Sequence, residues 1–331
     1  MEERKLNTRQ PKPLEELNVI DDFLFNEIMA DEEKGEEVCR MIIGTVLDRE
    51  VKKITFTPQR TIPGISERKH GIRLDAFIKE FHDENGKDGT DISVYDVEPD
   101  NTSEEKNSLP KRSRYYGDLI DVKLLDTGVD YDDLPELVTI FILSYDPFGA
   151  GSMYYEAGTV IKTHPEIPYN DGVRRIYLYT KGKVSENAGA GEKRLKNLLM
   201  YINNSTDSNV TDEITRRLDQ IVKITKEKKD FGVRYMKSWL LEKKLKEEGR
   251  QEGREEGRQE GEWLALLRMI CRKLAKGKSV VMIADELEED EETIKEICEV
   301  AKKYAPDYDA EAICKEFMEK MKEAEKEEYI V

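Results

Sequence analysis

The sequence predicts an α/β fold, in which a mixed β-sheet is flanked by helices and is followed by an all-helical C-terminal extension. Three observations support this prediction. The elements at the N-terminal side follow the order helix, strand, strand, strand, helix, strand, strand. Residues 137–144 (LVTIFILS) form a continuous apolar run of strand length, as expected for a strand buried on both faces. From Gly191 onward the apolar residues recur with helical spacing.

The first elements are a leader and one or two helices. Residues 1–17 are polar and contain two prolines, so we expect a disordered leader. Apolar residues recur at helical spacing over 19–47, although the polar interval 30–37 leaves open whether this is one helix or two. Residues 51–57 alternate and predict a strand, and the prolines and glycine in 57–69 predict a loop.

A hairpin is the next feature, and it carries the candidate site. Two strand-like runs, 72–79 and 91–97, are separated by a polar turn over 82–90 that contains Asn-Gly and Asp-Gly pairs. Asp75 lies inside the first run and Glu98 directly follows the second, where apolar alternation alone would not place a carboxylate. Because Mg²⁺ prefers oxygen ligands, two carboxylates on neighbouring strands can converge on one such cation.

After the hairpin, the pattern returns to a helix and two more strands. Residues 101–107 are polar and loop-like, and 109–127 predict a helix that has Pro in its first turn and ends at Gly128. Residues 137–144 and 174–180 predict strands. We therefore assign 18–190 to the α/β core.

The C-terminal part is predicted to be helical throughout. We expect 191–247 to be a helical part of the core, with a helix break near 230–232, and 263–331 to be a separate helical unit. Within that unit, Gly277-Lys278-Ser279 is expected to end one helix and cap the next. The following helices resemble a helix-turn-helix, but 285–292 (DELEEDEE) is too acidic for a helix presented to DNA.

A short repeat connects these two helical parts. Residues 248–262 read EGRQEGREEGRQEGE, with a glycine at every fourth position. Glycine costs about 1 kcal/mol per helical position relative to alanine, which favours a charged connector helix that frays. Small residues at this spacing also permit the close approach of a second helix, so a homo-oligomer through 248–262 is the other interpretation.

Composition limits the classes of function. The chain has 331 residues and a net charge of −17, which is unusual for a nucleic-acid-binding protein, but residues 151–250 hold 20 Lys and Arg against 14 Asp and Glu. We expect no membrane span, because no run of about 18 apolar residues exists, and the N-terminus lacks a secretory signal. The four cysteines have no CxxC spacing, which favours reduced thiols in a cytoplasmic protein.

The amino-acid sequences of several segments resemble those of a known family. The order α-β-β-β-α-β, with Asp on the second strand and Glu ending the third, is similar to that of the PD-(D/E)XK nucleases. More specifically, the chain resembles the PD-(D/E)XK nuclease family transposases, a group that includes the recombination-promoting nucleases. The resemblance covers roughly residues 17–250 and is carried by the segments FLFNEIMAD, GIRLDAFIKE, VYDVEPD, LPKRSRYYGDLID and FILSYDPFG.

The resemblance implies a restriction-endonuclease-like core that cleaves DNA phosphodiester bonds with Mg²⁺ or Mn²⁺. Asp75 and Glu98 would ligate the metal, together with the backbone carbonyl of Pro99, which proline retains. The metal would lower the pKa of a bound water and offset charge on the scissile phosphate.

Position 100 departs from the family pattern. The superfamily has Lys there and this family often has Gln, whereas this chain has Asp100. Three interpretations follow: Asp100 is a further metal ligand, or Lys111, Arg112 or Arg114 on the following helix supplies the missing cation, or cleavage has been lost. The sequence thus predicts a metal-dependent DNA endonuclease of mobile-element origin, with a catalytically impaired DNA-binding or oligomeric scaffold as the alternative.

Overall fold

The computed structural model describes residues 10–62, 72–82, 92–103, 106–125, 130–184 and 187–317. The chain divides into two compact units, Met1–Trp239 and Leu240–Val331. The first unit is α/β, as the sequence predicts, and the second is helical in its described part.

A six-stranded mixed sheet forms the centre of the first unit, with the order β1-β2-β3-β4-β6-β5. Strands β1, β2 and β3 are antiparallel neighbours, β3, β4 and β6 are parallel, and β5 is antiparallel to β6. The strands are β1 (Lys53–Ile62), β2 (Ile72–Phe81), β3 (Ile92–Asp100), β4 (Glu136–Leu143), β5 (Tyr154–Ala157) and β6 (Val173–Tyr179).

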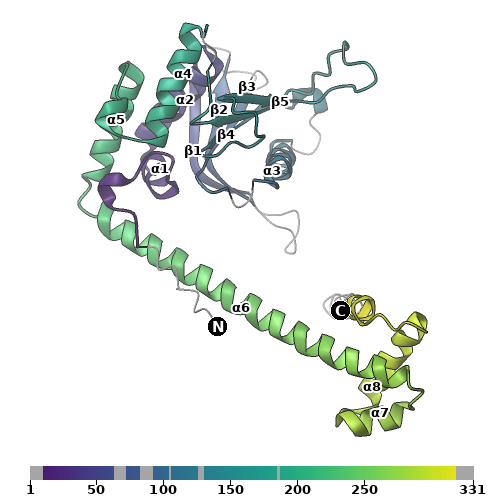
Figure 1. Ribbon diagram of the computed structural model, residues 1–331. Coiled ribbons are helices and arrows are strands. Elements are labelled where there is room, and N and C mark those ends of the chain that lie inside the picture. Colours follow the sequence, from purple (N-terminus) through teal and green to yellow (C-terminus); the bar gives the residue numbers. More distant parts are fainter. Residues whose placement is uncertain are drawn as a thin grey trace. The chain divides into compact units, whose positions relative to one another are not determined.

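Helices cover both faces of this sheet (Figure 1). One face packs against α1 (Asp22–Met29), α2 (Glu32–Leu47), α4 (Ala190–Asn203) and α5 (Glu213–Lys226), with side chains from all four helices in one apolar core. The other face packs against α3 (Leu109–Leu124) through two smaller apolar clusters. Successive side chains of β4 point to opposite faces of the sheet, and helices cover both faces. The sequence of β4 is therefore an almost uninterrupted apolar run.

The structure differs from the sequence prediction in the N-terminal elements. The segment 19–47 contains two helices, and most of its polar interval belongs to α2. Strand β1 extends through Pro58, where a loop was predicted, because an edge strand tolerates a residue without an N–H. Residues 14–16 form a 3-10 turn and Leu17 is buried, so the described end of the predicted leader is packed.

Later differences have similar causes. Strand β5 was missed because it has four residues, and none of them is buried. The hairpin prediction is confirmed in that β2 and β3 are antiparallel neighbours, while residues 83–90 of the turn predicted over 82–90 lie outside the described residues, as does Gly128. The helix predicted over 109–127 ends at Leu124.

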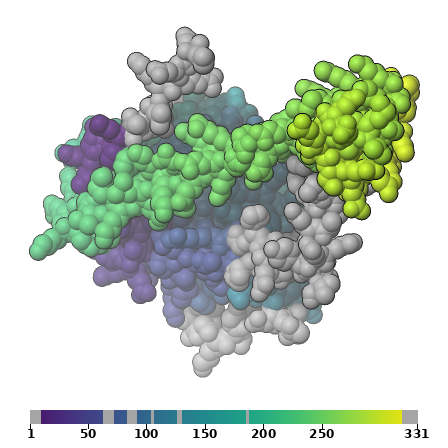
Figure 2. Space-filling view, turned by 90° about the horizontal axis from the view of Figure 1, so that it is seen from below, coloured from purple at the N-terminus to yellow at the C-terminus, as the bar shows by residue number. Residues whose placement is uncertain are grey.

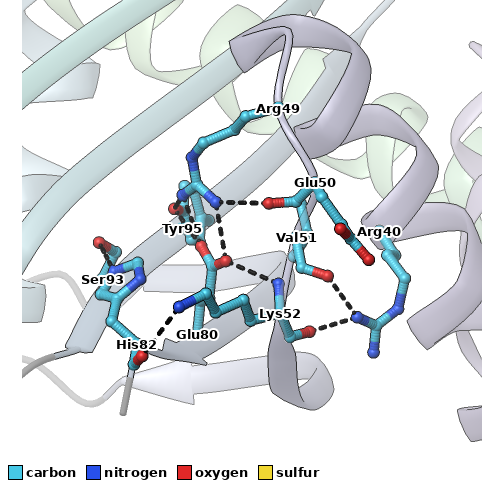
Figure 3. A network of polar contacts seen from close by, with 9 residues as sticks. All are labelled: Arg40, Arg49, Glu50, Val51, Lys52, Glu80, His82, Ser93 and Tyr95. Atoms are coloured by element: carbon cyan, nitrogen blue, oxygen red, sulfur yellow. Dashed lines mark hydrogen bonds and ion pairs between the residues drawn. The ribbon is translucent and has the colours of Figure 1, made fainter. Parts of the chain in front are cut away.

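A polar network anchors the helical layer to one end of the sheet (Figure 3). Glu80 of β2 is completely buried and accepts two hydrogen bonds from the Arg49 guanidinium, at 2.8 and 2.6 Å. The Tyr95 hydroxyl on β3 donates to the same carboxylate at 2.7 Å, and the backbone N–H of Lys52 donates at 2.9 Å. Each oxygen of this buried carboxylate therefore has two donors.

Helix α6 (Phe231–Leu274) begins in the first unit and continues into the second. Its 44 residues include the glycine repeat, so the separate connector and the helix predicted from residue 263 are parts of one helix. Ion pairs along its surface support the repeat, including that between Arg258 Nη1 and Glu262 Oε1 at 2.6 Å. In Figure 2 the atoms of α6 are coloured green.

The second unit has its own small core. The end of α6 packs with α7 (Val280–Leu287), α8 (Glu291–Ala301) and the helical segment 310–317. The predicted stop and cap are confirmed: Gly277 has a φ of 73°, and the Ser279 hydroxyl accepts a hydrogen bond from the Met282 N–H at 3.3 Å.

Two further predictions concern the environment of the protein. No helix among the described residues is long and apolar enough to cross a membrane. All four cysteines are free, and three of them, Cys39, Cys271 and Cys298, are buried. Burial raises the pKa of each of these three thiols, so they behave as apolar core side chains.

Candidate active site

The two carboxylates singled out in the sequence are brought together by the pairing of β2 and β3. The antiparallel register that places Ala76 opposite Val97 brings Asp75 beside Glu98. The backbone N–H of Asp75 donates a hydrogen bond to Glu98 Oε1 at 2.9 Å. Glu98 is buried, while Asp75 is partly exposed.

An irregularity in β1 lies opposite Asp75. The pairing of β1 with β2 runs in one register but omits the pair that Gln59 and Asp75 would form. Gln59 has a φ of 47°, in the left-handed region that residues other than glycine rarely adopt. Its amide donates to Asn26 Oδ1 at 2.8 Å, and Asn26 in turn hydrogen-bonds the Asp75 carboxylate. This distortion ties α1 to the strand at the position of the carboxylate.

A third carboxylate, that of Asp96, belongs to the same site. Asp96 and Glu98 are two residues apart on β3, so their side chains leave the strand on the same face. Asp96 is completely buried, and neither of its carboxylate oxygens accepts a hydrogen bond from a donor among the described residues. Only a proton shared with the neighbouring Glu98 gives these oxygens a hydrogen bond.

Burial and neighbouring carboxylates raise the pKa values of all three groups. Burial, followed by repulsion from Asp22, raises the pKa of Asp75 to about 6. Burial also raises the pKa of Asp96 to about 8, with Asp75 adding to the effect. The pKa of Glu98 is raised well above its usual value by burial and by repulsion from Asp96 and Asp75. The cluster thus retains protons, because its surroundings do not compensate three negative charges.

The residue at the end of β3, Asp100, has a different role. Its Oδ2 accepts hydrogen bonds from the Arg112 guanidinium at 2.6 Å and from the Tyr145 hydroxyl at 3.1 Å. Its Oδ1 accepts one from the backbone N–H of Thr102 at 3.0 Å. Although burial opposes it, the hydrogen bond from Arg112 to Asp100 raises the pKa of the guanidinium. Asp100 therefore holds Arg112 in a fixed position.

Arg112 is the basic residue of α3 that the structure brings to the site. Its positive charge lowers the pKa values of both Asp75 and Asp96, whereas Lys111 and Arg114 are exposed on the helix. Pro99 lies between Glu98 and Asp100 on β3.

Four site residues had no role in the sequence prediction: Asp96, Asn26, Tyr116 and Tyr145. Asp96 had a detectable signal, because it precedes Glu98 by two residues in the run VYDVEPD and shares its face. Tyr116 of α3 faces the three carboxylates, and burial and repulsion from Glu98 raise its pKa to about 12. Nothing in the sequence places this tyrosine, or Asn26, opposite two strands.

The carboxylate oxygens of the site suit a hard cation, but few of them are available as ligands. Among the residues that the structure describes, no group of three or more His, Cys, Asp and Glu side chains is arranged to hold a metal ion. Asp75 and Glu98 therefore form at most a pair of carboxylate ligands. Such a pair is typical of Mg²⁺, which is held by one or two carboxylates and completes its shell with waters and substrate phosphates. The buried Asp96 oxygens, which have no hydrogen-bond partner among the described residues, also fit a neighbouring cation.

Comparisons with known proteins were made at three levels. No family model, no curated protein and no solved structure matches the chain. Its function is therefore inferred from the chemistry of its own residues.

Proposed function

We propose that the chain is a divalent-cation-dependent DNA endonuclease built on a PD-(D/E)XK core, as its resemblance to the transposase-related nucleases implies. One observation carries the proposal: Asp75, Asp96 and Glu98 form a buried carboxylate cluster with raised pKa values beside a fixed guanidinium. A structural cluster of carboxylates would have enough donors to keep their pKa values low, whereas a catalytic one is completed by its cation and substrate.

Asp75 and Glu98 would hold Mg²⁺ or Mn²⁺, with the carbonyl of Pro99 as a backbone ligand. When bound there, the ion would lower the pKa of a water and offset charge on the scissile phosphate. Asp96, completely buried beside Glu98, would keep its own proton when Glu98 loses its proton to solvent and becomes a ligand. The neutral Asp96 keeps the net charge of the cluster within what one divalent cation compensates.

Arg112 would replace the lysine that the superfamily has at position 100. Its guanidinium is held by Asp100 and lies 5.4 Å from the centre of the Phe141 ring, so its position is fixed from two sides. A fixed positive charge beside the carboxylates would stabilise the charge that develops on a phosphate in the transition state. Asp100 is then a positioning residue rather than a metal ligand.

Plasmid nicking with Mg²⁺ or Mn²⁺ tests the proposal. We expect Asp75→Asn and Glu98→Gln to lower the nicking rate by about 100-fold or more, because each removes a charged ligand worth several kcal/mol to the transition state. Asp118→Asn, which alters an exposed carboxylate on α3, is the matched control and should retain the wild-type rate. Absence of metal-dependent nicking by the wild-type protein would refute the proposal.

Binding of the ion is measured separately. Millimolar Mg²⁺ should raise the melting temperature of the wild-type protein, since a ligand that binds only the folded state stabilises it. The same addition should leave Asp75→Asn unchanged.

The alternative function is a catalytically impaired DNA-binding or oligomeric scaffold on the same fold. Two observations favour it: Arg112 is already paired with Asp100, and the four glycines of the repeat over 248–262 have no atom within 4 Å of an added Cβ. Light scattering on the full chain tests the oligomer, with Gly253→Glu and Gly257→Glu together as the variant and Gln259→Glu as the control. A variant with the same mass as the wild-type protein would remove the oligomeric role of this helix.

A further inference from the structure

A polar cavity lies outside the carboxylate site, where the chain leaves β6 and where α4 ends. Its volume is about 590 Å³. The side chains that matter for its chemistry are three lysines and three asparagines: Lys181, Lys183, Lys196, Asn203, Asn204 and Asn209.

The wall that carries two of the lysines is held by backbone contacts. The N–H of Lys183 donates to the carbonyl of Gly151 at 2.7 Å, and the N–H of Met153 donates to the carbonyl of Lys183 at 3.2 Å. Between the two lysines, Gly182 packs so closely that an added Cβ would lie 2.4 Å from the Met153 backbone. The side chains of Lys181 and Lys183 therefore project from a turn whose backbone is held in place.

The opposite wall is equally well defined. The Thr180 hydroxyl donates to Asn203 Oδ1 at 3.0 Å, which fixes the orientation of that amide. The side chain of Asn209 donates to the carbonyl of Asn204 at 2.7 Å. Lys196 projects from α4 on the same wall.

The charge of the cavity is unusual for this chain. The protein has 71 Asp and Glu residues against 54 Lys and Arg, yet no carboxylate among the described residues lines this cavity. None of the ion pairs among the described residues involves Lys181, Lys183 or Lys196, whereas Arg217 and Lys223 of α5 have acidic partners. Three uncompensated positive charges around a cavity attract an anion.

The cavity and the carboxylate site lie at the same end of the parallel strands but on opposite faces of the sheet, because α4 lines the cavity whereas Asp96 and Glu98 face α3. Strands β3, β4 and β6 are parallel and end in step, since Asp100 pairs with Leu143 and Leu143 with Tyr179. Two strand spacings separate β3 from β6, a distance of about 10 Å. The segment before α1 also joins the two places: Asp21 accepts a hydrogen bond from Asn101 after β3, and Ile20 is hydrogen-bonded to Ile202 of α4.

We propose that this cavity is a phosphodiester subsite that binds the DNA backbone a few nucleotides from the bond to be cut. The inference rests on the proposed nuclease function and names how the substrate is held. Lysines act on phosphates as point charges, and amide groups add hydrogen bonds without reading the base sequence. DNA rises about 3.4 Å per nucleotide along each strand, so roughly three nucleotides span the distance between the ends of β3 and β6. Binding here is therefore expected to be independent of sequence.

Fluorescence anisotropy with a labelled 20-base-pair duplex in EDTA tests this subsite without cleavage. The variant is the full chain with Lys181→Gln, Lys183→Gln and Lys196→Gln. The matched control carries Lys123→Gln, Lys162→Gln and Lys229→Gln, which remove the same charge from exposed lysines elsewhere in the first unit. We expect the cavity variant to bind about tenfold more weakly, and its plot of log affinity against log salt to be shallower by about two to three.

The outcomes separate this inference from the nuclease function. Equal affinity and salt slope for the cavity variant and the control variant would overturn the subsite, as would a wild-type protein that does not bind the duplex. A competition arm with inorganic phosphate tests the source of the anion: displacement of DNA by millimolar phosphate at constant ionic strength would mean a free-phosphate site and would also overturn the subsite. Asp75→Asn should bind DNA like the wild-type protein, so loss of nicking together with retained, lysine-dependent binding supports the subsite.

Discussion

Strands β2 and β3 carry two buried carboxylate sites, and these differ in how burial of the charge is compensated. At one end of the hairpin, Glu80 receives hydrogen bonds from Arg49, Tyr95 and a backbone N–H, and these hold its pKa at about 2 although burial opposes ionisation. At the other end, burial raises the pKa values of Asp75 and Asp96, and among the described residues Asp96 has no donor apart from a protonated Glu98. The difference indicates which site stabilises the fold and which is left incomplete for a ligand.

Removal of the Glu80 carboxylate is expected to have the largest effect. Glu80→Ala leaves the buried Tyr95 hydroxyl without its acceptor and the partly exposed Arg49 without its partner. We expect the free energy of unfolding to fall by about 3 kcal/mol, as measured by urea denaturation. Glu50→Ala, at an exposed neighbouring position, is the control. A loss below 1 kcal/mol would mean that this network does not anchor the helices to the sheet.

The pH dependence of stability should differ between the two sites. The folded-state pKa of Glu80 lies below its unfolded value, so its contribution is present above pH 4.5 and is lost as the pH falls toward 2. The folded-state pKa values of Asp75 and Asp96 lie above their unfolded values. Their contribution is therefore complete below pH 4 and is lost as the pH rises through 6 to 8.

Unfolding measured from pH 3 to 8 tests this contrast. We expect stability to decline by on the order of 2 kcal/mol between pH 5 and 8 in the absence of divalent cations, and this decline should be smaller in Asp96→Asn. Glu80→Gln should instead flatten the acid side of the profile. A wild-type profile that rises steadily to pH 8 would contradict the raised pKa values.

Asp96→Asn should stabilise the protein, which is the opposite of the effect at Glu80. An asparagine has nearly the same shape, carries no charge and can donate a hydrogen bond to Glu98. We expect a gain of about 1 kcal/mol at pH 8 by urea denaturation, with Asp118→Asn unchanged as the control. Destabilisation by Asp96→Asn would show that its carboxylate has a donor after all.

The two sites also differ in how far the sequence predicts them. Asp75 and Glu98 stand out because they interrupt apolar strands, and their pairing follows from the hairpin. Which basic residue of α3 faces them depends on how the helix is rotated against the sheet, and only the structure selects Arg112 over its neighbours. The Glu80 network was not predicted, because Arg49 and Tyr95 are distant from Glu80 in sequence.

Some boundaries of helices and strands depend on nearby residues and others on the assembled sheet, and only the first kind was predicted from the sequence. The stop and cap at Gly277 and Ser279 depend on local backbone preferences and were predicted correctly. The extension of β1 through Pro58 was not predicted, because it depends on β1 being an edge strand of the assembled sheet.

The smallest effect is expected from removing a single donor of the Glu80 site. Tyr95→Phe deletes the hydroxyl that donates to Glu80 Oε2 at 2.7 Å but leaves Arg49 and the Lys52 N–H in place. We expect a loss of about 1 kcal/mol by urea denaturation, the usual contribution of one buried hydrogen bond. Tyr131→Phe, at an exposed position, is the control. A loss as large as that of Glu80→Ala would mean that the hydroxyl, rather than the guanidinium, holds the carboxylate, because one remaining bidentate partner would then be insufficient.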